Sequence, residues 1–183
     1  MKTLKTIGLV MLGIIVLFVV VAYLLPRHIQ VARSTVINAP PEVVFNQVNV
    51  LQNWENWSPW HDIDPEMQII YEGPEMGKGA SYSWFSEDPG AGKGKLTITE
   101  SVPNSKITTE IDFMERGTAT TEYSFAEIKE GTLMTWSMET DMGNNPVARY
   151  FGLFMDKLLG RDFEKGMENI KKIVTNLPAL ESD

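Results

Sequence analysis

The hydrophobic pattern of the chain begins with one uninterrupted apolar run and changes afterwards to short alternating segments. Ile7–Leu25 is a run of 19 residues without a charged or strongly polar side chain. At about 1.5 Å per residue, a helix of this length spans roughly 28 Å, close to the hydrocarbon thickness of a bilayer. A helix packed on a soluble core would carry polar residues along one face, and this run has none. We interpret it as a transmembrane anchor.

A secretory signal peptide is the alternative interpretation of this run. Its apolar stretch is usually about 7–15 residues long and is followed by a small-residue cleavage site. The run here is longer and ends in Tyr23-Leu24-Leu25-Pro26, without an A-x-A pattern. Lys2, Lys5 and the α-amine precede the run, and Arg27 and Arg33 follow it. The positive-inside rule therefore favours, by one charge, a single-pass protein with its domain on the outer (periplasmic or extracellular) side.

The segments after the anchor predict a strand, two short helices and then a series of further strands. Val31–Ile37 is typical of a first strand, and Asn38 followed by two prolines and Glu42 is typical of a helix start. A second short helix is expected over Leu51–Trp57, ending near Ser58-Pro59. Six further strands then follow between Gly, Pro, Asn and Asp residues. They are expected over 67–72, 80–86, 95–102, 106–113, 118–128 and 132–140.

The last segment predicts one long helix. Asn144-Asn145-Pro146 is a capping sequence, and apolar residues recur at three- and four-residue spacing from Val147 to Val174. Clean period-two alternation in the strands indicates an antiparallel sheet with one covered face. The expected fold is α+β: a helix-grip, in which a curved antiparallel sheet of about seven strands wraps around the C-terminal helix. We expect an anchor over 1–28, this domain over 29–177 and a tail over 178–183.

Charge is distributed unevenly between these parts. Residues 1–33 hold four of the 16 basic side chains and no acidic one, which leaves 24 acidic and 12 basic side chains, a net of −12, for the remainder. So acidic a domain would be repelled by phosphate backbones, and nucleic-acid binding is excluded. The chain has no cysteine, so disulfides and Cys-ligated metals are excluded as well.

Four segments give the chain a resemblance to a known family. They are INAPPEVVF (37–45), WENWSPW (54–60), GKGASYSW (77–84) and GRDFEKG (160–166). In this order and spacing the sequence resembles the SRPBCC (START-like, Bet v 1-like) superfamily in its polyketide cyclase/dehydrase-related branch, over roughly Val31–Val174. The resemblance implies a helix-grip fold with a ligand cavity between sheet and helix. Its members bind lipids, sterols, hormones or polyketides, and some are enzymes, so function must be argued from the site.

The candidate ligand site consists of the side chains expected on the inward faces of the sheet, the long helix and the tryptophan segment. Aromatic and Met linings with few polar groups suit lipid-like ligands. The alternative is that the same large side chains fill the core, and the tryptophan segment would then close one end of it. The predicted lining is Trp57, Trp60, Tyr82, Trp84, Ile98, Ile111, Tyr123, Phe125, Trp136, Met138, Phe151, Phe154, Met155 and Leu158.

Other candidate chemistry is sparse. The loop with His61, Asp62, Asp64 and Glu66 could suggest a metal site, but only one histidine is available there, and we interpret it as a solvated acidic loop. The glycine-rich segments 77–79 and 90–95 do not match a phosphate loop and lead into strands. No catalytic, metal or cofactor site is therefore predicted, and an enzyme is disfavoured.

Three functions remain open at this stage. The first is a membrane-anchored module that binds a hydrophobic small molecule. The second is a cyclase/dehydrase-like enzyme with Tyr82, Tyr123 or His61 as proton-handling groups, which would require an ionisable side chain inside the cavity. The third is a non-catalytic envelope or stress-associated interaction domain with a filled core and an exposed apolar patch.

Overall fold

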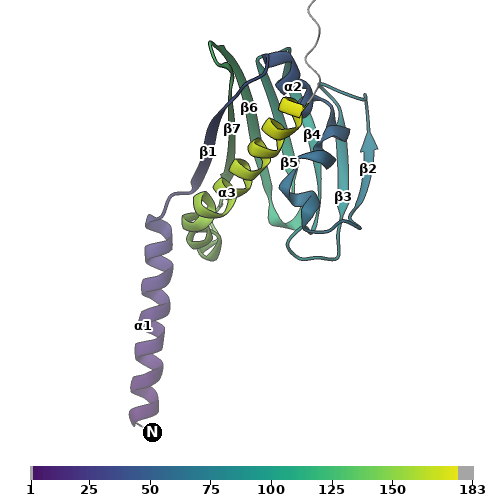
Figure 1. Cartoon of the computed structure of the whole chain (residues 1–183). Coiled ribbons are helices and arrows are strands. Elements are labelled where there is room, and N and C mark those ends of the chain that lie inside the picture. The colour runs from purple at the N-terminus through teal and green to yellow at the C-terminus, as the bar shows by residue number, and fades with distance from the viewer. Residues whose placement is uncertain (1, 177–183) are drawn as a thin grey trace, which may run out of the picture.

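The computed structural model describes residues 2–176 and shows an N-terminal helix followed by one α+β domain (Figure 1). The expected tail at 178–183 lies outside the described residues. The elements are α1 (Lys2–Leu24), β1 (His28–Ile37), α2 (Pro41–Asn49), the 3₁₀ helices η1 (Leu51–Asn56) and η2 (Pro59–Asp62), β2 (Gln68–Glu72), β3 (Ser81–Phe85), β4 (Lys93–Val102), β5 (Lys106–Asp112), η3 (Met114–Arg116), β6 (Thr118–Ile128), β7 (Gly131–Asp141) and α3 (Pro146–Asn176).

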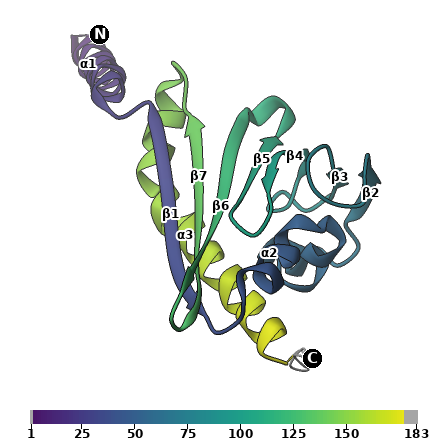
Figure 2. The same ribbon diagram turned by 90° about the horizontal axis from the view of Figure 1, so that it is seen from above.

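The sheet has seven strands in the order β1-β7-β6-β5-β4-β3-β2, and every neighbouring pair is antiparallel. Each strand from β3 to β7 therefore pairs with its predecessor, and β1 pairs with β7. The sheet curves, with α3 running along the β1–β7 side of its inner face and α2 and the short helices lying over the other side (Figure 2). This is the helix-grip fold, as predicted.

The helix starts show one correction and one confirmation. Asn38 does not cap α2, because Pro40 occupies the cap position without a side-chain hydrogen bond. At α3 the expected cap is present: the Asn145 side-chain oxygen accepts hydrogen bonds from the amides of Val147 (2.9 Å) and Ala148 (3.4 Å). The second short helix is a 3₁₀ helix, and a further 3₁₀ turn, η2, was not anticipated.

Two glycines on α3 allow the helix to approach the sheet closely. A Cβ on Gly166 would lie 2.8 Å from a ring atom of Trp136. The Arg33 guanidinium occupies the space beside Gly160, where it forms ion pairs with Asp156 (2.9 Å) and Glu164 (3.0 Å). The sheet-facing side of α3 is therefore defined by the row Gly152, Gly160, Phe163, Gly166, Met167 and Ile170, whose members are buried.

The apolar helix α1 contacts α3 near its own C-terminal end. The Phe18 ring stacks on the Tyr150 ring of α3 at a centroid distance of 4.2 Å, and the Tyr150 hydroxyl donates to the Phe18 carbonyl oxygen at 3.0 Å. Arg149 of α3 is buried against the last turn of α1. By length and composition, residues Thr3–Leu24 form one helix that could cross a membrane, and a signal sequence would meet the same criterion.

Candidate functional site

The interior between sheet and helices is built mainly of aromatic rings. Trp136 of β7 stacks on Phe163 of α3 at 4.3 Å and lies 5.1 Å from Tyr123 of β6, centroid to centroid. Large side chains thus fill much of the predicted cavity, as the core-packing alternative proposed. The predicted lining residues that are buried here are Trp57, Tyr82, Ile98, Tyr123, Phe125, Trp136 and Met138.

The tryptophan segment closes one side of this interior. Trp54 and Trp57 are three residues apart on η1 and its cap, both are buried, and their rings lie 4.7 Å apart. Both indole nitrogens donate to backbone carbonyls of α2, those of Val48 and Gln47. Because these polar atoms are already paired, Trp54 and Trp57 are fixed structural parts of the core. Trp60 is half-buried and packs edge-on against Trp136 at 5.7 Å.

Three polar atoms inside this apolar interior have no hydrogen-bond partner among the described residues. They are Thr109 Oγ1, Thr121 Oγ1 and Trp136 Nε1. Thr109 and Thr121 are directly paired across β5 and β6, and Thr121 is paired with Met138 of β7, two residues from Trp136. All three atoms therefore belong to neighbouring inward positions. Natural proteins pair nearly all buried polar groups, so this cluster is the strongest polar feature of the interior.

Two tyrosines of the interior bear on the enzyme alternative. Burial raises the pKa of Tyr82, and the nearby Tyr71 hydroxyl adds to the effect. Burial likewise raises the pKa of Tyr123, with a smaller contribution from Tyr82. Both hydroxyls therefore stay protonated at neutral pH and can donate a hydrogen bond. As bases they would be unsuited, because a general base must give up its proton near the working pH.

The interior is least covered at the end of the sheet next to α1. The strand register identifies the residues at this end. Ile29, just after α1, pairs with Thr140, and Thr140 pairs with Ala119. Ala119 lies opposite Ile111, and Trp84 lies opposite Gly94 further along the same end of the sheet. Several large apolar side chains at this end are half-buried instead of fully buried. Those predicted from the sequence are Trp84, Ile111 and Met155, and those missed are Phe113 and Leu159. We call these five residues the apolar rim.

Three residues predicted to line the interior do not do so. Phe151, Phe154 and Leu158 are 54%, 59% and 50% exposed. At about 100° per residue they lie roughly 120–180° around the helix axis from the sheet-facing row of α3. The structure therefore corrects the expectation. The mistake arose because the apolar periodicity of α3 covers two faces, and spacing alone does not say which face meets the sheet. With Lys157, Arg161 and Asp162, these side chains border a shallow hollow of about 540 Å³.

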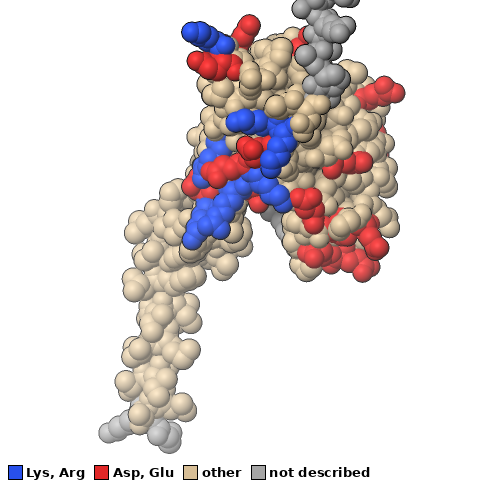
Figure 3. Space-filling model, viewed as in Figure 1, with Lys and Arg blue, Asp and Glu red and all other residues tan. Residues whose placement is uncertain are grey.

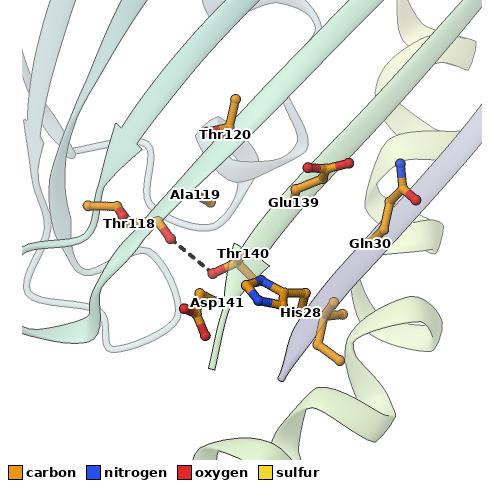
Figure 4. Close-up of a pocket in the computed structure, with 9 residues that line it drawn as sticks. His28, Gln30, Thr118, Ala119, Thr120, Glu139, Thr140 and Asp141 are labelled. Atoms are coloured by element: carbon orange, nitrogen blue, oxygen red, sulfur yellow. Dashed lines mark hydrogen bonds between the residues drawn. The ribbon is translucent and has the colours of Figure 1, made fainter. Parts of the chain in front are cut away.

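A second, polar hollow of about 450 Å³ lies where β1, β6 and β7 run side by side (Figure 4). His28, Gln30, Thr120 and Glu139 on its border are exposed and alternate with the inward residues of their strands. Arg27 pairs with Asp141 at 2.6 Å and, together with the Gly143 amide, lowers the pKa of that carboxyl. So polar and open a lining does not suit an apolar ligand.

The acidic loop contains no converging set of ligands. Among residues 2–176, no group of three or more His, Asp or Glu side chains is arranged to hold a metal ion. His61 Nε2 is buried without a partner, and burial lowers the pKa of His61 despite the opposing effect of Glu55 and Asp62. Asp62 forms an ion pair with Lys165 of α3 at 2.7 Å. This ion pair therefore links η2 to α3.

Fold and interior together define a helix-grip domain with a mostly apolar interior. A profile of the family described as polyketide cyclase / dehydrase and lipid transport matches residues 28–175. The chain belongs to this family, within the SRPBCC superfamily that its sequence resembles. No curated protein matches the chain.

Solved structures with similar folds are remote in sequence. SA2116 of Staphylococcus aureus, a protein of unknown function, is 12% identical with a TM-score of 0.62 over 81% of this chain and 94% of its own. The di-domain ARO/CYC StfQ from the steffimycin biosynthetic pathway is 9% identical with a TM-score of 0.62, over 79% of this chain and 50% of its own. Ara h 8.0201 is 15% identical with a TM-score of 0.56, over 81% of this chain and 98% of its own. These similarities establish the fold.

Proposed function

We propose that this protein is a membrane-anchored module that binds a hydrophobic, lipid-like small molecule inside its helix-grip domain. The family description, which names lipid transport besides cyclases and dehydrases, supports a ligand-binding domain of this kind. The observation that carries the proposal is the cluster of unpaired polar atoms on Thr109, Thr121 and Trp136, buried among aromatic and apolar side chains. An oxygen function on a mostly apolar molecule would offer these atoms a hydrogen-bond partner, and few polar groups in an apolar lining are typical of such sites.

The route to this interior is proposed from the position of the apolar rim. The rim lies at the end of the sheet that follows α1, and α1 is the chain's one described helix of membrane-spanning length and composition. With α1 in a bilayer, the rim would face the membrane surface. A ligand leaving the bilayer would then meet half-buried apolar side chains before it met water. Entry requires the interior rings to move, because they fill the space between the sheet and the helices.

The test uses the full chain in nanodiscs and two matched threonines. Thr121 is buried and inward, whereas its neighbour Thr120 is exposed on the outer face of the same strand. Binding is measured with cis-parinaric acid, a fluorescent fatty acid, through energy transfer from the tryptophans. We expect saturable binding, about tenfold weaker for Thr121→Val, which corresponds to the loss of about 1.4 kcal/mol from one hydrogen bond. Thr120→Val should bind like the wild type.

Native mass spectrometry of the detergent-extracted chain provides the second readout. A co-purifying lipid-like molecule that is lost in Thr109→Val/Thr121→Val would support the proposal. A bare chain that also fails to bind the fatty acid would contradict it. That result would favour the interaction-domain alternative, which the aromatic filling of the core and the exposed apolar residues of α3 already fit.

A further inference from the structure

The outer side of α3 changes character along its length. Four large apolar side chains lie on it in the half next to α1, and all are at least half exposed: Val147 (65%), Phe151 (54%), Phe154 (59%) and Leu158 (50%). We call these four residues the outer apolar stripe. Further along the same side the exposed residues are charged, among them Arg161, Lys165 and Glu168. A solvated helix face has no need of such a stripe, and large exposed apolar patches mark interaction sites.

The contact between α1 and α3 determines where the outer apolar stripe lies along the axis of α1. Phe18, which stacks on Tyr150, lies six residues before the end of α1, or about 9 Å along the helix axis. Tyr150 lies on α3 between Val147 and Phe151. The start of α3 is therefore level with the last two turns of α1, not beyond its end. If α1 spans a bilayer, these turns lie in its outer hydrocarbon and headgroup region.

Charges beside the stripe match a lipid surface. Lys157 and Arg161 border the stripe, are exposed, and form no ion pair with another described residue. Figure 3 shows basic side chains gathered over α3, above the uncharged surface of α1, with some acidic side chains among them, while a further group of acidic side chains lies at the right of the view, away from α1. Long basic side chains at the edge of an apolar helix face reach lipid headgroups while their stems stay apolar.

We propose that the first half of α3 is an interfacial membrane helix, with the outer apolar stripe inserted in the same bilayer leaflet that receives the end of α1. Two attachments, α1 and the stripe, then hold the domain in one orientation relative to the bilayer, whereas α1 alone would leave this orientation variable. This orientation turns the apolar rim toward the lipid. The inference rests on the membrane anchoring proposed above, and it is independent of whether the interior binds a ligand.

The experiment uses the absence of cysteine in the chain, which makes every introduced cysteine unique. Nitroxide labels are attached to Phe154→Cys in the stripe, Val10→Cys in α1, and Glu168→Cys on the same side of α3 about 21 Å further along. The full chain is reconstituted into vesicles of phosphatidylcholine and phosphatidylglycerol. Collision rates with oxygen, which concentrates in lipid, and with a water-soluble nickel chelate are then compared.

We expect the oxygen-to-nickel collision ratio of the Phe154→Cys label to approach that of Val10→Cys and to exceed that of Glu168→Cys several-fold. A Phe154→Cys label that behaves like Glu168→Cys while Val10→Cys is in lipid would overturn the interfacial helix and leave the anchoring intact. Aqueous behaviour of Val10→Cys would overturn both. Strong dipolar broadening between Phe154→Cys labels of two copies would overturn the inference in favour of a contact between protomers.

A second experiment places the label at another position of the stripe and alters two of the neighbouring apolar side chains. Phe151→Ser/Phe154→Ser changes exposed side chains, so the domain should keep its folded circular-dichroism spectrum. With the label moved to Leu158→Cys, we expect a several-fold loss of the oxygen-to-nickel ratio in the double variant. An unchanged ratio in a folded protein would contradict insertion of the stripe.

Discussion

Arg149, in the first turn of α3, donates from Nη1 to the carbonyl oxygen of Tyr23, 3.2 Å away in the last turn of α1. The same nitrogen lies 3.5 Å from the Ala22 carbonyl oxygen, Nε donates to the Gly143 carbonyl oxygen at 3.0 Å, and the guanidinium lies 5.2 Å from the Tyr23 ring centroid. A cation at a helix C-terminus pairs its unsatisfied carbonyls and interacts favourably with the helix dipole. One buried side chain thus joins the apolar helix to the domain.

Replacing this side chain should loosen the two parts relative to each other. We expect Arg149→Met to broaden the distance distribution between spin labels at Leu9→Cys and Glu168→Cys in nanodiscs, because the contacts of the guanidinium with three backbone carbonyls are lost. The control is Lys172→Met, an exposed residue of the same helix that lies outside the outer apolar stripe. If the distribution stays as narrow in Arg149→Met as in the control, the Arg149 contacts do not hold α1 in place.

The unpaired threonines predict a change in stability that is independent of any ligand probe. In the ligand-free chain, Thr121→Val removes a buried hydroxyl without a partner, so the free energy of unfolding should stay equal or rise by up to about 1 kcal/mol. Thr120→Val, on the exposed face, should change it by less than about 0.5 kcal/mol. The measurement is urea unfolding in detergent. A loss of more than 1 kcal/mol in Thr121→Val would indicate that its hydroxyl is paired in the folded protein.

The close approach of α3 to the sheet predicts different effects on stability for substitutions at two glycines of this helix. Gly166→Ala places a methyl group against the Trp136 ring, which is held by neighbouring rings, so we expect a loss of about 1–3 kcal/mol. In Gly152→Ala the new methyl group would lie 3.0 Å from the Cδ1 atom of Ile29, and this end of the Ile29 side chain can rotate away. The gain in helix propensity, about 1 kcal/mol, should then make it nearly neutral. Thermal unfolding distinguishes the two, and equal effects would argue against a rigid contact at Trp136.

His61 predicts a pH dependence of stability in mildly acidic solution. Burial lowers the pKa of His61 in the folded protein below the unfolded value of about 6.5. Above that value the residue is neutral in both states and contributes nothing to the pH dependence. As the pH falls below about 6.5, the unfolded state binds the proton first, so the folded state loses stability down to the folded pKa.

The corresponding measurement compares the wild type with His61→Gln between pH 7.5 and 5.5. The wild type should lose more stability over this interval than the variant does. The other histidine, His28, remains in both proteins and cancels in the comparison. Identical pH profiles would mean that His61 takes up its proton without hindrance in the folded state.

Much of the fold could be predicted from the alternation of residues. All seven strands and α3 appear within about three residues of their expected bounds, because period-two alternation and turn residues specify strands locally. The inward residues of the sheet could be predicted for the same reason: a strand has only two faces, and one was visibly apolar. On α3 the three- and four-residue spacing correctly predicted that Met155 packs against the core. It wrongly predicted the same for Phe151, Phe154 and Leu158, which are exposed.

By itself, the sequence determined the apolar α1, the antiparallel meander, the capped long helix and the family, since each depends on local spacing or on motifs. Only the tertiary structure decided which face of α3 meets the sheet, because Gly160 and Gly166 mark that face through distant partners on β1 and β7. It also decided that aromatic rings fill the interior, that Thr109 and Thr121 lie together unpaired, and that the start of α3 is level with the end of α1. These features join residues far apart in the chain, and no local pattern records such distances.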